Sequence, residues 1–358
     1  MKYKIPIVSV CILIIAIIFL SGNNGQKNGT VRVGVIIPLS ENAATIGEKV
    51  RRGIMIATEE ANEPRIQFVF EDGGIEPRKA LSAYQKLTNV DDISMFVGPF
   101  GPDQIMSIAP ILKSEDVMLG VTLCENRFRS YPQIFCTYPS IPDQTESGVR
   151  IIQRLRLKKI GFLTQIGEVG DIIEHELKER EVEGGYTVAV AERIKPGERD
   201  FRTLIAKIKA AQTDAIYFAS LPEEGYIILQ QLNALGYSGK IFAVFDAVDE
   251  KLAALGSAAE EVYLPGHISP IFQEKFVAQY TQKYGETPDL YAALGHSIAI
   301  TLINGLRKND FELKNIKEKI IGMTADTGIT DFQFKPDQTV AIPVETLLFR
   351  DGKMREME

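Results

Sequence analysis

Several residue types are scarce or missing in this chain of 358 residues. Trp is absent, and His occurs only at His175, His267 and His296. The missing Trp excludes a tryptophan cage around a ligand, and the wide spacing of the histidines gives no cluster typical of a metal site. The net charge is −7, and no basic stripe of the kind that holds a nucleic-acid duplex is visible. We therefore expect neither a metal nor a nucleic-acid partner.

The motifs of common enzyme chemistries are missing as well. A dinucleotide site needs Gly-x-Gly-x-x-Gly directly after the first strand, but Gly34 lies within the expected strand and Pro38 follows it. The stretch GYSGK, which ends at Lys240, has the wrong glycine spacing for a P-loop, and no Gly-x-Ser-x-Gly elbow occurs. Paired carboxylates such as Asp91 and Asp92 are typical of surface or helix-end charges. These absences argue against an enzyme and predict no cofactor.

The N-terminus differs from the rest of the chain. Lys2 and Lys4 precede an apolar run of 16 residues from Ile5 to Leu20, and the polar stretch SGNNGQKNGT follows. This order is typical of a secretory leader, although the run is short for a membrane span and an Ala-x-Ala cleavage pattern is missing. LSGN is similar to a lipoprotein box with Asn23 in place of the lipidated Cys. Residues 1–30 are interpreted as an uncleaved anchor or a cleaved signal peptide, with a cytoplasmic protein as the third alternative. Either of the first two places the body in the periplasm or on the outer face of the cytoplasmic membrane.

Three cysteines are present, and Cys11 lies inside the leader. In an oxidising compartment Cys124 and Cys136 can pair as a disulfide. The alternative is that both are small buried hydrophobic residues.

From Val31 onward, short apolar runs alternate with helical patterns. VRVGVII is almost continuously apolar, as in a strand of a sheet that is covered on both faces. In the segment that follows, Val50, Ile54, Ala57 and Ala61 fall on one helical face. Two such runs are expected, over residues 31–137 and 158–265, followed by helical material from 271 to about 321 and by two short strands with a turn at 336–337. Strands that alternate with helices predict an α/β fold with doubly wound parallel sheets.

Several stretches, in order along the chain, resemble one family. VRVGVIIPLSENAATIGEKVRRGIMIATEEAN is similar to the opening of the extracytoplasmic solute-binding proteins of branched-chain amino acid ABC transporters, with Gly53, Ala57 and Asn62 on the helix pattern G-x-x-x-A-x-x-x-x-N. FEDGGIEPRKALSAYQKL, MFVGPFGPDQIMSIAPILKSEDVML, GERDFRTLIAKIKAAQTDAIYFAS and YAALGHSIAITLINGL resemble later parts of the same family. The resemblance covers nearly all of the chain after Val31.

The resemblance implies the fold of type I periplasmic binding proteins. Two Rossmann-like doubly wound parallel-sheet lobes are joined by a hinge of three crossovers, and a ligand lies in the cleft between them. The crossovers are expected near 138–139, 265–266 and 328–330. Lobe one then comprises 31–138 plus 266–327, and lobe two comprises 139–265 plus 328–358. The loop from Pro38 to Gly47 becomes a wall of the cleft, at the carboxyl edge of a parallel sheet.

The resemblance also implies site residues. In amino acid binders of this family, a hydroxyl residue after the third strand and an Ala-Ala-Thr stretch hold the ligand's carboxylate and ammonium, and an acid from lobe two faces the ammonium. Here Pro102 stands at the hydroxyl position, Leu123-Cys124-Glu125 at the Ala-Ala-Thr position, and Asp246 at the acid. The expected ligand-binding set, which includes positions often aromatic in the family and a helix N-terminus, is Ile46, Gly101, Pro102, Asp103, Leu123, Glu125, Ile166, Leu221 and Asp246. Glu125 can instead be a surface charge and Asp246 a helix cap. Backbone N–H groups around Gly101 are expected to face the ligand, and Asp103 can cap the helix that follows.

The departures from the family pattern bear on the ligand. A free carboxylate beside two acids would be repelled unless Arg127 or backbone dipoles compensate. We therefore expect a ligand other than a standard amino acid, neutral or cationic and with an apolar part. The predicted function is capture of a small amino-acid-like or amide-like ligand and its delivery to an ABC permease by a monomeric protein. A ligand-sensing receptor domain without transport is the alternative, and a doubly wound enzyme is a third.

Overall fold

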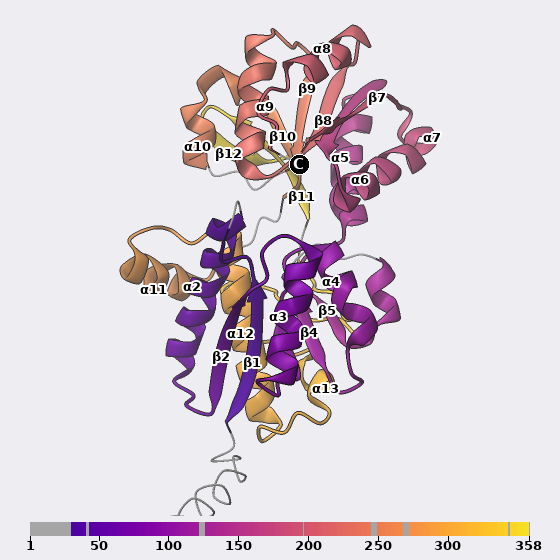
Figure 1. Ribbon diagram of the computed structural model, residues 1–358. Coiled ribbons are helices and arrows are strands. Elements are labelled where there is room, and N and C mark those ends of the chain that lie inside the picture. The colour runs from indigo at the N-terminus through magenta and orange to yellow at the C-terminus, as the bar shows by residue number, and fades with distance from the viewer. Residues whose placement is uncertain are drawn as a thin grey trace, which may run out of the picture.

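The chain forms two α/β halves, one above the other (Figure 1). The structure is a computed structural model that describes residues 30–40, 43–121, 126–195, 197–244, 249–267, 272–342 and 344–357. The leader predicted for residues 1–30 lies outside this part except for its last residue. Within the described residues, no helix combines the length and the apolar character that a membrane crossing requires.

The lower half in Figure 1 is built on a parallel sheet of five strands in the order β2-β1-β3-β4-β5. The strands are β1 (Val31–Ile37), β2 (Ile66–Asp72), β3 (Met95–Val97), β4 (Val117–Gly120) and β5 (Ile134–Cys136). Alternate side chains enter two different cores. Val35, Val97 and Leu119 pack on one side of the sheet, and Ile36, Phe96 and Met118 on the other. Since both faces are covered, the strands are almost continuously apolar, as predicted.

Helices from two distant parts of the chain cover this sheet. They are α2 (Ala44–Ala61), α3 (Pro77–Asn89), α4 (Pro102–Ile108), α11 (Glu274–Tyr284), α12 (Leu290–Lys308) and α13 (Ile316–Ile320), with short 3-10 turns η2 (Ala109–Ile111) and η3 (Asn126–Ser130). Helix α12 runs beside α2 (Figure 1) at very short range. A Cβ atom on Gly53 would lie 1.9 Å from the Ala292 carbonyl oxygen, and one on Gly295 would lie 2.3 Å from that of Val50. Only glycine permits this approach of two helix backbones.

The upper half is built on a sheet of seven strands in the order β12-β11-β10-β9-β8-β6-β7. The parallel strands are β6 (Lys159–Gln165), β7 (Thr187–Ile194), β8 (Ala215–Ala219), β9 (Lys240–Val244) and β10 (Val262–His267), and β11 (Glu345–Arg350) and β12 (Lys353–Glu356) are antiparallel. The helices are α5 (Ile141–Arg154), α6 (Glu168–Glu179), α7 (Glu181–Gly184), α8 (Arg202–Ala210), α9 (Pro222–Ala234) and α10 (Asp249–Ala254), with the 3-10 turn η4 (Gly256–Ala258). Tyr217, Phe242 and Tyr263 stack across β8, β9 and β10.

The predicted doubly wound parallel architecture is confirmed. Helix α5 was not predicted, because it lies in the stretch between the two expected strand–helix runs. The start of this helix nevertheless carries two local sequence signals. The Ser140 hydroxyl accepts a hydrogen bond from the Asp143 N–H at 3.2 Å as the helix cap, and a proline stands in the first turn.

The predicted third crossover at 328–330 is wrong. Ile329, Phe332, Phe334, Val340 and Ile342 pack in the core of the five-stranded sheet, so the chain leaves this half only after Ile342. These apolar side chains cover the sheet beside β5, where the Cys136 N–H donates to the Gln338 carbonyl at 2.9 Å. The expected turn at 336–337 joins Phe334 to Val340, whereas β11 and β12 form a separate hairpin. The lobe division at 138–139 and 265–266 remains our proposal.

Ser147 of α5 joins two strands of the seven-stranded sheet where the chain crosses between the halves. Its buried hydroxyl accepts the Gly266 N–H of β10 at 2.8 Å and lies 3.2 Å from the Thr346 hydroxyl of β11, and it donates to the Gln144 carbonyl at 2.7 Å. One hydroxyl thus connects α5 to both strands.

Replacing Ser147 by alanine should lower the free energy of unfolding by about 1–3 kcal/mol, because the buried Gly266 N–H and Thr346 hydroxyl lose their partner. Urea unfolding of the variant measures this loss. Ser257→Ala on the exposed surface is the matched control and should change stability by no more than about 0.5 kcal/mol. Equal stability of the two variants would contradict the role of Ser147.

A polar cluster with one buried member, His296, joins α2 to α11 and α12. His296 Nε2, in a side chain that is only 2% exposed, lies 3.0 Å from Glu60 Oε2, and Lys275 pairs with the same carboxylate. Hydrogen bonding to His296, and then to Lys275, lowers the pKa of Glu60 from 4.5 to about 2, against burial, which raises it.

This pKa predicts an acid-sensitive contribution to stability. Because the folded-state pKa is depressed, the contribution is complete above the unfolded value of 4.5 and is lost as the pH falls towards 2. After allowance for solvent screening it amounts to about 2 kcal/mol. Glu60→Gln should therefore be less stable than the wild type at pH 7, and the difference should vanish near pH 2 in urea unfolding. A difference that does not depend on pH would contradict this explanation.

Candidate functional site

A cavity of about 380 Å³ lies between the two sheets. Its walls come from the carboxyl ends of the strands in both halves and from the loops that follow them. From the lower half the lining residues are Ile46, Ile75, Phe100, Gly101, Pro102, Asp103, Gln104, Val121, Tyr138, Leu290 and Tyr291. From the upper half and α5 they are Ile141, Gln144, Thr145, Thr164, Gln165, Ile166, Gly167, Val169, Gly170, Ile173, Tyr217, Ala219, Ser220, Leu221, Pro222, Val244, Pro265 and Gly266. Open α/β sheets bind their ligands at this edge.

The topology explains why the cavity is rich in helix N-termini. In a parallel sheet every crossover helix begins near the carboxyl end of the preceding strand. First-turn residues of α2, α4, α5, α6, α9 and α12 all line the cavity. Helix N-termini carry partial positive charge and unpaired N–H groups, which favour oxygen atoms of a ligand. Helices α4 and α6 also contact each other across the cleft.

The structure places six of the predicted ligand-binding residues on the cavity wall. They are Ile46, Gly101, Pro102, Asp103, Ile166 and Leu221. Leu123, Glu125 and Asp246 lie outside the described residues, so their predicted roles stay predictions. Cys124 also lies outside them, whereas Cys136 is disulfide-bonded. The pairing of these two cysteines remains our proposal.

Two details predicted for the loop after β3 are wrong. The Gly101 N–H was expected to be free for a ligand, but it donates to Gln104 Oε1 at 2.8 Å. Asp103 was expected to cap the following helix, but α4 begins at Pro102, with Gly101 as the cap residue and no side-chain capping bond. Proline suits the first helical position because its φ angle is preset and its missing N–H would have no partner there.

The aromatic residues of the cavity were missed in the sequence. Phe100 and Tyr291 form a ring pair at 5.9 Å on the wall of the lower half, and Tyr138 and Tyr217 line the side of α5 and β8. Tyr217 is fully buried, and burial raises its pKa far above the usual range, so its hydroxyl stays neutral and bonded to Thr145. Tyr217 is the central residue of β8, and nothing in the apolar run around it marks it as a lining residue.

The polar residues of the upper wall were also missed in the sequence. Thr164 and Gln165 end β6, and Ser220 directly follows β8. The Ser220 hydroxyl is buried without a hydrogen-bond partner in the described structure. An orphan hydroxyl at a cavity wall is a candidate contact for a ligand.

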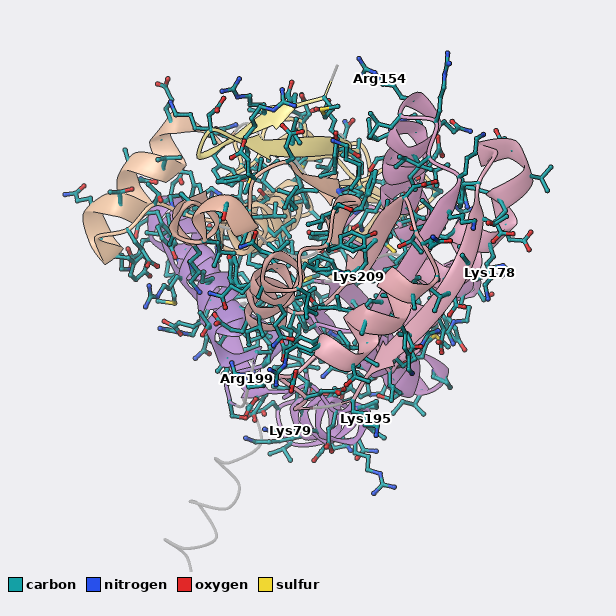
Figure 2. All side chains as sticks on the ribbon, turned by 90° about the horizontal axis from the view of Figure 1, so that it is seen from above. Lys79, Arg154, Lys178, Lys195, Arg199 and Lys209 are labelled. Atoms are coloured by element: carbon teal, nitrogen blue, oxygen red, sulfur yellow. The ribbon has the colours of Figure 1, made fainter. Side chains whose placement is uncertain are left out.

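The lining is apolar over most of its area, with uncharged polar groups at a few points. Asp103 is the one charged residue among the described lining residues. The basic side chains labelled Arg154 and Lys178 in Figure 2 lie at the outer surface of the upper half. No group of His, Cys, Asp and Glu in the described part of the chain has the arrangement of a metal site. The chemistry of this wall suits the reversible binding of a small, largely apolar molecule.

Comparison with known proteins decides the family. A sequence model described as periplasmic binding protein matches residues 30–345. The chain belongs to the periplasmic binding protein family. The Leu/Ile/Val-binding protein BraC3 of Rhizobium johnstonii is 24% identical to this chain over 239 residues, which are 64% of this chain and 65% of that protein. The alignment therefore spans just under two thirds of that relative, and the predicted resemblance to branched-chain amino acid binding proteins is confirmed.

Solved structures share the fold of this family member. A leucine-binding protein, LivK, from Thermotoga maritima superposes with a TM-score of 0.78 at 20% identity, covering 92% of this chain and 98% of that chain. A solute-binding protein of an ABC transporter from R. palustris, in complex with benzoate, superposes with a TM-score of 0.81 at 18% identity, covering 92% of this chain and 95% of that chain. These likenesses establish a periplasmic binding protein fold.

Proposed function

We propose that this protein captures a small amino-acid-like or amide-like ligand with an apolar body, in the cleft between its two halves, and delivers it to an ABC permease. The apolar interlobe cavity of about 380 Å³ carries the proposal. Residues of both halves line this cavity. Closure of the halves about the crossovers would therefore enclose a ligand. The names of the relatives support the apolar body, since leucine, isoleucine, valine and benzoate all carry one.

The first experiment measures thermal unfolding of the full-length protein against a ligand panel. The panel contains branched-chain and aromatic amino acids, benzoate-type acids, amides, polyamines and short peptides. A ligand that binds the native state stabilises it by about 2.7 kcal/mol at one hundred times its dissociation constant, which raises the melting temperature. We expect a rise with at least one ligand that has an apolar body. A melting temperature unchanged by every panel member would contradict the proposed function.

Transport is distinguished from sensing by uptake. Deletion of the gene should lower cellular uptake of the ligand that the panel identifies. Normal uptake in the deletion strain, with loss of a response to the ligand, would favour a sensing receptor.

We further propose an extracytoplasmic location through the N-terminal leader. Protease added to intact spheroplasts should then digest the protein. Mass spectrometry of the isolated chain separates the two forms of the leader, because an uncleaved anchor retains the full 39.8 kDa. Protection from the protease in unbroken spheroplasts would favour the cytoplasmic alternative.

A further inference from the structure

We infer that the cleft selects an uncharged polar head group over a carboxylate, with Gln165 and Ser220 as the pair that contacts the head. Gln104 is a positioning residue on the opposite wall. It occupies the backbone N–H of Gly101, which could otherwise bind the carboxylate of an acid. The inference rests on the proposed function and names the ligand class for the same cavity.

Gln104 closes one route to acid binding. Its side chain is 2% exposed and makes three hydrogen bonds. Oε1 accepts the Gly101 N–H at 2.8 Å, and Nε2 donates to the carbonyls of Gly73 and Gly74 at 3.1 and 3.0 Å. The next residue, Pro102, has no N–H. Two successive backbone positions of this lining loop therefore offer no donor to a ligand.

The negative charge of Asp103, on the same wall, also disfavours a ligand carboxylate. The Asp103 carboxylate is exposed and lines the cavity. A ligand carboxylate nearby meets repulsion, whereas the N–H donors of an amide meet an acceptor. The described lining residues include no Lys, Arg or His that would offset this charge.

The upper wall offers a matched pair of uncharged groups. Strands β6 and β8 are paired in parallel with Thr164 opposite Ala219, so the next residues, Gln165 and Ser220, follow side by side at the cavity edge. The Ser220 N–H donates to the Val244 carbonyl at 3.2 Å, which holds the residue in line with the sheet.

Neither side chain of this pair is bonded to another group of the protein within the described residues. The Ser220 hydroxyl is buried without a partner, and the Gln165 amide makes no side-chain hydrogen bond within the described structure. A hydroxyl and an amide each donate and accept. Together they match a head group that presents both a donor and an acceptor, and they match an acceptor-only carboxylate less well.

The test uses ligand pairs of equal shape that differ only in the head group. Benzamide against benzoate and isovaleramide against isovalerate are titrated into the full-length protein by calorimetry. We expect the amide of at least one pair to bind at least tenfold more tightly than its acid. In Ser220→Ala and Gln165→Ala the affinity for that amide should fall, with little change for the acid.

Gln104 is tested by the ratio of the two affinities. Gln104→Ala frees the Gly101 N–H, so the preference for the amide should shrink at least threefold. Gln231 provides the matched control. It braces backbone in the same way, accepting the Phe201 N–H at 2.7 Å and donating to the Arg199 carbonyl at 2.9 Å, but it lies outside the cavity lining. Gln231→Ala should lower stability and leave the ratio unchanged.

The results separate three claims: the preference for an uncharged head group, the role of Gln104 and the proposed function. Acids that bind the wild type as tightly as their amides would overturn the inference while leaving the proposed function standing. A ratio that is the same in wild type and in Gln104→Ala would overturn the role of Gln104. If Gln104→Ala does not fold, the wild-type ratio and the Ser220→Ala variant still decide the head group. Absence of binding by these pairs and by the whole ligand panel would overturn both the inference and the proposed function.

Discussion

The Gly53→Val variant should fail to form a stable native state. At this position a Cβ atom would lie 1.9 Å from the Ala292 carbonyl oxygen and 2.8 Å from the His296 nitrogen, both of which belong to the backbone of α12. Side chains can rotate away from an added group, but two helix backbones must separate. Separation would open the core of the lower half, to which both helices contribute their buried faces.

The expected loss exceeds about 4 kcal/mol, a large share of the roughly 5–15 kcal/mol that stabilises a typical native protein. Circular dichroism during urea unfolding measures it. Glu59→Ala on the exposed face of α2 is the control, and it removes only the ion pair with Lys283, which contributes about 1 kcal/mol or less. A Gly53→Val protein as stable as the Glu59→Ala protein would contradict the close packing of α2 on α12.

The Gly47→Ala variant should lose ligand affinity by about tenfold or more, equivalent to about 1.4 kcal/mol. A Cβ atom on Gly47 would lie 1.8 Å from the Pro38 carbonyl oxygen, so the loop between β1 and α2 must move outward. Ile46, which lines the cavity, is the neighbouring residue and would move with the first turn of the helix. The cleft wall would then no longer be held in the geometry that fits the ligand.

Calorimetry with a ligand that the panel identifies measures this loss. The control is Thr45→Ala, because Thr45 is exposed in the same helical turn and lies outside the cavity lining. We expect wild-type affinity in the control. Unchanged affinity in Gly47→Ala would show that the position of this loop does not govern binding.

The parts of the fold that the sequence predicts depend on local patterns. Gly53, Ala57 and Asn62 illustrate this. Gly53 lies at the helix contact, Ala57 is fully buried, and Asn62 ends α2 in the left-handed conformation at φ 46°. Each role fits its residue type, since Asn tolerates positive φ and small residues permit close packing. The alternation of strands and helices was predictable in the same way, and with it the edge at which the cavity lies.

The parts that could not be predicted depend on contacts between distant residues. Gln104 binds the carbonyl of Gly73, 31 positions away, and Ser147 binds the N–H of Gly266, 119 positions away. No periodicity marks such pairs. The packing of Phe332 and Phe334 in the lower core was missed because a short segment with two aromatic residues suits a strand of either half. That the Gly101 N–H is bonded to Gln104, and is not free for a ligand, likewise follows only from the three-dimensional arrangement.

Both halves of the molecule are completed by segments from near the end of the chain. Helix α12 closes the core of the lower half, and β11 joins β10 to β12 in the upper sheet. A ribosome adds about 5–20 residues per second, so the first strands emerge many seconds before their partners exist. Neither half can complete its core from a nascent chain that lacks these segments. The topology therefore delays completion of the two cores until these segments have been synthesised, and in that interval the incomplete sheets expose apolar surface that favours aggregation.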